Sequence, residues 1–134
     1  MKKMQITLII PALLLPLFSA FSQTINFSPD KPMPGEELTI TFNPEGTALE
    51  GMDNFDGAIY FLEENLPMAH DLELEQKGDV FVGKNSISDD AKGVFVTFRI
   101  ADEDITVTGA EYGKMLYESD RTTPVKGAYF QQGL

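Results

Sequence analysis

Residues 37–42 read Glu-Leu-Thr-Ile-Thr-Phe, and this stretch decides the fold class of the chain. Leu38, Ile40 and Phe42 alternate with polar residues, so a β-strand would place all three apolar side chains on one face. Residues 93–100, Gly-Val-Phe-Val-Thr-Phe-Arg-Ile, repeat this alternation. Both stretches therefore predict strands that are buried on one face and that share an apolar core.

Further short strands are predicted around these two, at residues 25–27, 57–62, 70–74, 80–83, 105–108 and 115–117. Turn residues separate them, for example in Pro32-Met33-Pro34-Gly35 and in Gln76-Lys77-Gly78-Asp79. Residues 57–62 are apolar on both sides, which predicts a central strand that is covered on both faces. No stretch after residue 23 follows the i, i+3, i+4, i+7 spacing of an amphipathic helix.

Short strands with a turn signal about every 8–12 residues predict an all-β fold, an antiparallel Ig-like β-sandwich over residues 23–123. Tyr60 is expected to pack against a residue on the neighbouring strand. Residues 124–134 leave the strand pattern, so we expect a frayed tail or a truncated junction to a second domain. The predicted core consists of large apolar strand residues: Leu38, Ile40, Phe42, Ile59, Phe61, Phe81, Val94, Val96, Phe98 and Ile100.

Residues 1–22 have the layout of a cleavable signal peptide. Two lysines near the start precede an apolar run over residues 6–18, and the small residues Ala20 and Ser22 lie just before a cut ahead of Gln23. The alternative is an N-terminal membrane anchor. The run is shorter than the roughly 20 residues of a membrane span and is interrupted by two prolines, which favours the signal peptide. We therefore expect an exported protein in the periplasm or outside the cell.

The charge and cysteine content exclude several classes of function. The chain has 21 acidic and 10 basic residues and a net charge of −11; without the two lysines of residues 1–22, eight basic residues remain and the net charge is −13. Such a surface repels nucleic acids and anionic lipids. No cysteine is present, so neither a disulfide framework nor thiol chemistry can occur. Stability must then come from apolar burial.

No recognisable catalytic set is found, and the chain is predicted not to be an enzyme. His70 is the only histidine, and neither a Gly-x-Ser-x-Gly elbow nor a glycine-rich phosphate loop is present. Acidic residues in loops leave calcium binding open, although they lack the ligand alternation of an EF-hand and aspartate is common in turns. These groups are Asp53 and Asp56, Asp89 and Asp90, and Asp102, Glu103 and Asp104. No cofactor or metal is predicted.

Aromatic residues are the candidates for contact with a ligand or partner, since the chain has no tryptophan. They are Tyr112, Tyr117, Tyr129 and Phe130. Two functions stay open: an interaction module with a protein partner, and a domain that binds carbohydrate or a surface polymer by stacking sugar rings on exposed aromatic side chains. A hydrolase is a third, weaker alternative, because no pair of carboxylates is singled out.

Two motifs near the start of the domain resemble a known family. Residues 27–32, Phe-Ser-Pro-Asp-Lys-Pro, and residues 34–47, which begin Pro-Gly-Glu-Glu-Leu-Thr, resemble the N-terminal Ig-like module of exported thioredoxin-like (TlpA-type) disulfide reductases of Bacteroidetes. Residues 89–93 and 124–129 are similar to the same group, so the resemblance covers most of residues 25–130.

In that family a helical region and a thioredoxin domain with a Cys-x-x-Cys pair follow the module, and this chain carries neither. The resemblance therefore implies an accessory module, stand-alone or truncated, that works with a protein partner or a missing C-terminal domain. It implies no oxidoreductase activity.

Overall fold

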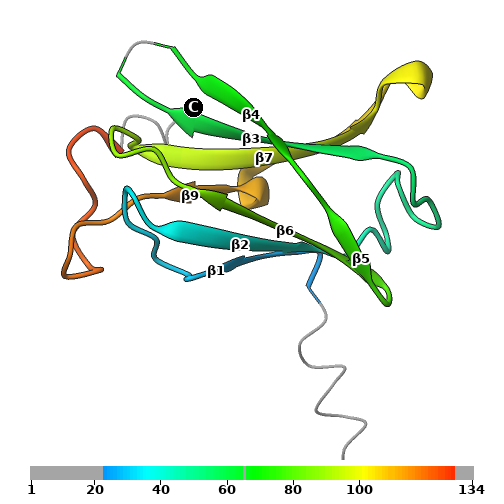
Figure 1. Ribbon diagram of the computed structural model, residues 1–134, viewed down its shortest axis with the longest axis horizontal. Helices are drawn as coiled ribbons and strands as arrows, with labels where there is room; N and C mark the ends of the chain where they lie inside the picture. The colour runs from blue at the N-terminus through cyan, green and yellow to red at the C-terminus, as the bar shows by residue number, and fades with distance from the viewer. Residues whose placement is uncertain (1–22, 65, 129–134) are drawn as a thin grey trace, which may run out of the picture.

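The computed structural model describes residues 23–64 and 66–128, which form two antiparallel sheets that face each other (Figure 1). The strand order of the first sheet is β1-β2-β6-β5, made of β1 (Ile25–Ser28), β2 (Glu37–Phe42), β6 (Val80–Ser86) and β5 (Glu75–Lys77). The order of the second sheet is β4-β3-β7-β8, made of β4 (Met68–Leu72), β3 (Asp56–Leu62), β7 (Gly93–Ile100) and β8 (Ile105–Val107). β9 (Gly113–Met115) also pairs with β7.

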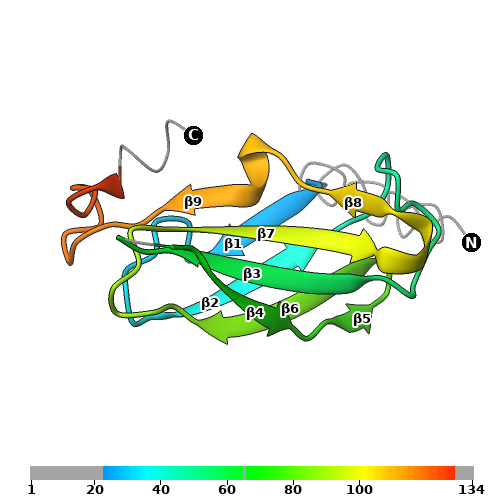
Figure 2. The ribbon, with the colours of Figure 1, turned by 90° about the horizontal axis from the view of Figure 1, so that it is seen from above.

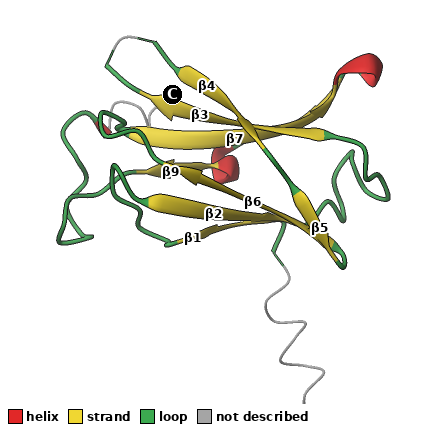
Figure 3. Cartoon of the chain, in the orientation of Figure 1, coloured by secondary structure: helices red, strands yellow, loops and turns green. Residues whose placement is uncertain are grey.

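The prediction of an all-β chain is confirmed, and the two facing layers are consistent with a β-sandwich. Figure 2 shows the strands of both sheets running in broadly the same direction, as in aligned sheet packing. The helical elements of the described part of the chain are two single 3₁₀ turns, η1 (Ala101–Glu103) and η2 (Ala110–Tyr112), which are coloured red in Figure 3.

The core lies between the sheets and contains all ten residues predicted for it, each at most 6% exposed. β2 pairs with β1 and β6 so that Ile40 lies opposite Phe27 and Gly83. The rings of Phe42 and Phe98, which come from opposite sheets, stack at 3.9 Å with an angle of 4° between their planes. This contact joins the two layers.

The chain changes sheets between β4 and β5. Residues 70–74 and 80–83 were expected to flank one turn as neighbouring strands, but β4 pairs with β3 while β5 forms the hairpin with β6 around Gly78, whose φ is 66°. All three residues of β5 are exposed. β5 pairs with β6 through its backbone, and the Gln76 side chain donates to the Gly78 carbonyl at 3.3 Å. Because no side chain of β5 is buried, its sequence has no apolar alternation that could reveal the strand.

Leu72 fills the corner where the chain crosses between the sheets and is 2% exposed. A Cβ atom on Gly83 would lie 2.8 Å from Leu72 Cδ1, and one on Gly57 would lie 3.1 Å from the Leu72 carbonyl oxygen. Because neither glycine has a Cβ atom, Leu72 can fit into the space beside them.

The segment after β9 packs on the domain as far as Ala128. The amide of Val125 donates to the Leu116 carbonyl at 3.0 Å, and the amide of Tyr117 donates to the Pro32 carbonyl at 2.8 Å. Ala128 is fully buried. Residues 124–128, which were expected to belong to a tail or a junction, are thus part of the packed structure.

The predicted signal peptide, residues 1–22, lies outside the described residues. Within the described ranges, the chain forms no helix of the length and apolar character needed to cross a membrane.

Candidate binding site

The outer face of the second sheet carries apolar side chains where a solvent-facing sheet usually has polar ones. Tyr60 and Leu62 on β3, Phe95 on β7 and Met115 on β9 are half-buried, and the strand register places them on the side away from the core. The prediction that residues 57–62 form a central strand is confirmed. Their outer side, however, is only partly covered, so an apolar face is open to solvent.

Tyr60 and Phe95 form the centre of this face. They are directly opposite in the β3–β7 pairing, and their rings stack at 4.5 Å with an angle of 5° between the planes. The predicted cross-strand packing of Tyr60 is thereby confirmed. Such a pair is rigid because each ring restricts the rotamers of the other. A rigid, half-exposed aromatic pair provides contact area at a low entropy cost.

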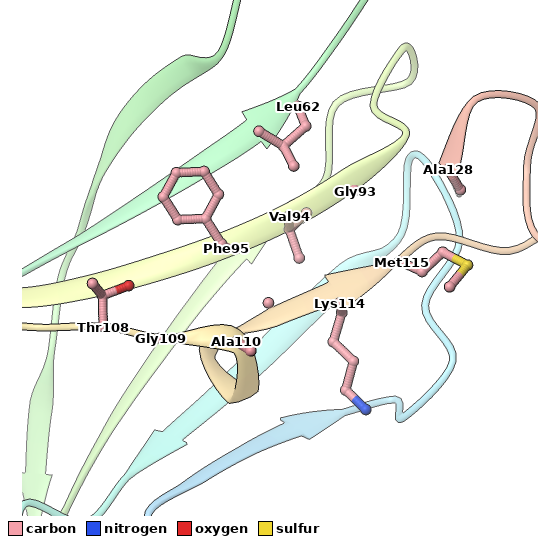
Figure 4. A pocket seen from close by; sticks show the side chains of 11 residues that line it. Leu62, Gly93, Val94, Phe95, Thr108, Gly109, Ala110, Lys114, Met115 and Ala128 are labelled. Carbon is pink, nitrogen blue, oxygen red and sulfur yellow. The ribbon is translucent and has the colours of Figure 1, made fainter. Parts of the chain in front are cut away.

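An apolar pocket of about 440 Å³ lies beside the ring pair and is lined by residues of β7, β9 and the connection at residues 108–110. Leu62, Phe95 and Met115 contribute apolar side chains to it, and Ala128 closes one end (Figure 4). The Thr108 hydroxyl donates to the Val96 carbonyl at 3.3 Å and so has a partner already. The pocket suits an apolar group rather than a charged one.

Lys114 also lines the pocket, but its ammonium group is engaged elsewhere. Figure 4 shows the side chain directed away from Phe95, toward the first sheet. Its Nζ lies 2.7 Å from Asp30 Oδ1 and 5.9 Å from the centre of the Phe27 ring. The hydrogen bond from Lys114 lowers the pKa of Asp30 below its ordinary value of 3.8. The pocket therefore receives the alkyl stem of Lys114 and not its charge.

The pocket exists because two short strands share the same edge of β7. β8 pairs with residues 98–100 and β9 with residues 93–95, so the chain leaves the sheet between them. This connection, residues 108–112, contains the turn η2. A single continuous strand would have covered the centre of β7, whereas the excursion leaves a hollow beside it.

Tyr112 closes the core below this excursion and is only 3% exposed. Its ring centre lies 6.3 Å from those of both Phe42 and Phe98. Burial raises the pKa of its phenol, and the neighbouring charge of Glu111 adds to this effect. The prediction of Tyr112 as a contact residue for a ligand or partner is corrected, because its ring belongs to the core.

The other predicted contact residues have different positions. Tyr117 is half-buried, and the Lys31 ammonium lies 5.7 Å from the centre of its ring. This cation lies over one face of the ring, and neither Lys31 nor Tyr117 lines the pocket beside β7. Tyr129 and Phe130 lie outside the described residues.

The candidate chemical groups do not assemble into a site in the described part of the chain. His70 is exposed on β4, and its ring centre lies 5.3 Å from that of Phe61. No three histidine or acidic side chains among residues 23–64 and 66–128 lie close enough together to hold a metal ion. The three acidic loops that left calcium open form no such group there.

A charged anchor fixes the loop that leads to Ala128. Arg121, whose φ of 56° is in the left-handed region, donates through both terminal nitrogens to the Glu36 carboxylate and through Nη1 to the Lys31 carbonyl at 3.0 Å. The hydrogen bond from Arg121 lowers the pKa of Glu36 below its ordinary value of 4.5. The loop thus has a defined place against the turn before β2.

Asp120 organises the same loop from within. Its carboxylate accepts hydrogen bonds from the Thr123 hydroxyl at 2.6 Å, the Thr123 amide at 2.8 Å and the Thr122 amide at 2.9 Å. These bonds lower the pKa of Asp120 to about 2, and the bond from the Thr123 hydroxyl has the largest effect. The Asp120 carboxyl is therefore ionised over the ordinary pH range, and in this form it holds the loop.

Comparison of this chain with protein-family models, with curated proteins and with solved structures found no match.

The apolar outer face was missed as a site because Tyr60 was expected only to pack against a residue on the neighbouring strand. The signal was present in residues 57–62, which are apolar on both sides, and in Phe95, which faces away from the predicted core side of its strand. An apolar residue on the outer side of two paired strands indicates an open face when no further element is predicted to cover it.

Proposed function

We propose that this chain is a non-enzymatic, exported accessory module that binds a protein partner through the outer face of the β4-β3-β7 sheet. The observation that carries the proposal is the stacked Tyr60–Phe95 pair beside a pocket of about 440 Å³. Tyrosine, phenylalanine and methionine are enriched at protein interfaces, and all three occur on this face.

The partner expected on this face presents an apolar or aromatic segment and carries no excess of negative charge. The net charge of the chain is −11, so an acidic partner would be repelled at long range. Apolar contact would supply the affinity, since the Thr108 hydroxyl and the Lys114 ammonium already have partners.

The order of the strands in the sheets also supports an Ig-like accessory module. In an Ig constant-type sandwich the first, second, fifth and fourth strands form one sheet. Here β1-β2-β6-β5 correspond to them if β4 is an additional strand of the other sheet. We therefore propose an Ig-like module related to the N-terminal module of the exported thioredoxin-like reductases, with residues 1–22 as its export signal.

The alternative is a domain that binds carbohydrate or a surface polymer. Half-exposed aromatic rings generally favour carbohydrate binding, because sugar rings stack on them. Here the Tyr60 ring is stacked on Phe95 and one face of Tyr117 is taken by Lys31. Glycan-array binding by the purified chain that is lost on Tyr117→Ala would favour the alternative, and turnover in a hydrolase panel would overturn both readings.

A phage-displayed peptide library tests the protein-binding proposal directly. We expect selected peptides to be apolar and aromatic, and Phe95→Lys to weaken the best of them by about 10–30-fold, the effect of losing a central interface residue. Isothermal titration calorimetry measures the affinities. The matched control is Thr39→Lys, which places the same charge on the outward side of β2.

The proposal fails if no peptide is enriched, or if Thr39→Lys weakens binding as much as Phe95→Lys does. Export is tested separately by fractionating cells that express the tagged chain with and without residues 1–22. We expect only the longer form to leave the cytoplasm, with a mass that corresponds to cleavage before Gln23.

A further inference from the structure

We propose that the protein partner adds an extended segment to the outer edge of β4, and that lysine or arginine residues flank this segment. The inference rests on the proposed function and gives the partner a conformation and a charge. It concerns the edge of the sheet and not the pocket beside β7.

β4 lies at the edge of the second sheet (Figure 1). Its five residues pair with β3 on one side, and no strand among residues 23–64 and 66–128 pairs with its other side. Four of the five residues are exposed. The outward backbone N–H and C=O groups of such a strand are a template on which an extended peptide adds a further strand.

The other strands at the sheet edges of the described chain are protected in ways that β4 is not. β5 has three residues, two of them charged, and β8 and β9 have three residues each. β1 has four residues and is followed directly by Pro29. Proteins commonly prevent edge pairing with short strands, charges and prolines. β4 is longer than these strands and contains neither lysine nor proline.

The edge is close to the stacked ring pair because the residue between them is small. Ala69 lies opposite Tyr60 in the β3–β4 pairing, so its side chain is on the same outer face. Neighbouring strands are about 4.8 Å apart, and a segment paired with β4 therefore lies about 10 Å from β3. A large apolar side chain of that segment reaches over Ala69 toward the Tyr60 ring, which connects the edge to the proposed binding face.

The charge around β4 favours a basic segment over a second copy of the chain. Residues 63–74 contain no lysine or arginine but four acidic residues, Glu63, Glu64, Asp71 and Glu73. None of the four forms an ion pair with a described residue. Two copies that paired through β4 would bring these charges together, whereas a basic segment is attracted to them.

A hollow of about 460 Å³ at one end of β4 extends this complementarity. Its lining includes the carboxylates of Asp56, Asp71 and Glu73. A lysine or arginine at the end of an added segment would lie close to these groups, so we expect the basic residues to flank the paired stretch and apolar residues to lie within it.

An array of synthetic nonapeptides is the probe, each with two lysines at both ends and five alternating threonine and apolar residues between them. We expect the purified chain to bind such peptides and the outward β4 amides to exchange about tenfold more slowly in the complex. Peptides with glutamate in place of lysine should bind about tenfold more weakly. Calorimetry measures the affinities, and hydrogen exchange followed by NMR locates the protected amides.

Two variants and a peptide modification test where the segment lies. Ala69→Lys places a charge on the edge strand and should weaken binding about tenfold. The matched control Gln76→Lys, on the edge strand of the other sheet, should not. N-methylation of alternate peptide residues removes the donors on one side of the added strand, so one methylated set should abolish binding and the other should leave it unchanged. The methylated peptides need no variant of the chain and decide the result if Ala69→Lys does not fold.

The inference is overturned if no lysine-flanked peptide binds, or if both methylated sets lose binding equally. A chain that is dimeric alone and monomeric with Ala69→Lys would assign the edge to a second copy. A monomer whose outward β4 amides already exchange slowly without peptide would assign the edge to another part of the same chain. Either result also overturns the inference.

The array and the library test fail separately. If Phe95→Lys weakens the library peptides while the array gives none of the expected effects, the outer face binds a partner without strand addition, and only this inference fails. If the array behaves as expected while Phe95→Lys has no effect, the edge binds a segment and the outer face is not the binding surface.

Discussion

At the scale of single residues, Phe98 is the side chain on which the two sheets depend most. It is fully buried, stacks on Phe42 of the facing sheet and makes an edge contact with Phe55 at 6.2 Å. We expect Phe98→Ala to lower the free energy of unfolding by about 3–5 kcal/mol, a large share of the stability of a domain of this size. Urea denaturation measures the loss. Thr97→Ala, one position away on the outer face, is the control and should cost far less.

The glycine at position 83 is a second residue whose identity is set by its surroundings. A Cβ there would lie 2.8 Å from two carbon atoms of Leu72, so Gly83→Ala should destabilise the fold by about 1–3 kcal/mol through overpacking. Leu72→Ala removes the atoms that clash. In a double-mutant cycle the alanine at 83 should therefore cost much less on the Leu72→Ala background. Additive losses would show that the two positions do not compete for space.

At the scale of elements, the strands that hydrophobic alternation could predict are those that face the core on one side. β2 and β7 bury every second residue, and their predicted bounds agree with the structure. β5 could not be predicted, because all of its residues are exposed and only its backbone pairs with β6. The predicted strand at 115–117 lies at 113–115 instead, where Gly113 and Met115 pair with β7.

The candidate site was predictable only in part, for a related reason. Sequence spacing assigns a side chain to one of two faces of a strand but does not say which other element covers that face. Tyr112 was expected at the surface, yet the turn η2 directs it into the core, since β8 and β9 separate there. The alternation of residues 93–100 puts Phe95 on the side opposite Val94 and Val96, but only the pairing with β3 brings it onto Tyr60.

The loop at residues 118–123 is the element for which a pH dependence follows. Arg121 holds the pKa of Glu36 below 4.5, and the bonds within the loop hold that of Asp120 at about 2. A carboxyl whose pKa is lowered by folding stabilises the fold above its unfolded pKa, and this contribution is lost as the pH falls through the folded value. We therefore expect the melting temperature to fall as the pH drops below about 4.5, the ordinary Glu value.

Two variants separate the contributions to this pH dependence. Glu36→Gln should lower the melting temperature at pH 7 and flatten the profile just below pH 4.5. Asp120→Asn should flatten the profile at lower pH, between pH 3.8 and about pH 2. Differential scanning calorimetry across this range gives both profiles. Profiles parallel to that of the unmodified chain would mean that neither carboxyl is stabilised by folding.

At the scale of the whole molecule, acidity and apolar exposure have different roles. The net charge of −11 keeps copies of the chain apart at long range, while the uncharged rings of Tyr60 and Phe95 offer a surface for close contact. A module with both properties can stay soluble and still bind a partner that brings the right apolar group. Raising the salt concentration would screen the repulsion and should favour self-association through this face if the face is free.

Truncation tests directly where the domain ends at its C-terminal side. A chain that stops after Thr123 loses the Val125–Leu116 hydrogen bond and the buried Ala128. This loss corresponds to about 2 kcal/mol, and its melting temperature should fall by about 8–16 °C. A chain that stops after Ala128 keeps these contacts, so its melting temperature should fall less. Equal melting temperatures for the two truncations would show that residues 124–128 add nothing to the fold, and the boundary would return to residue 123.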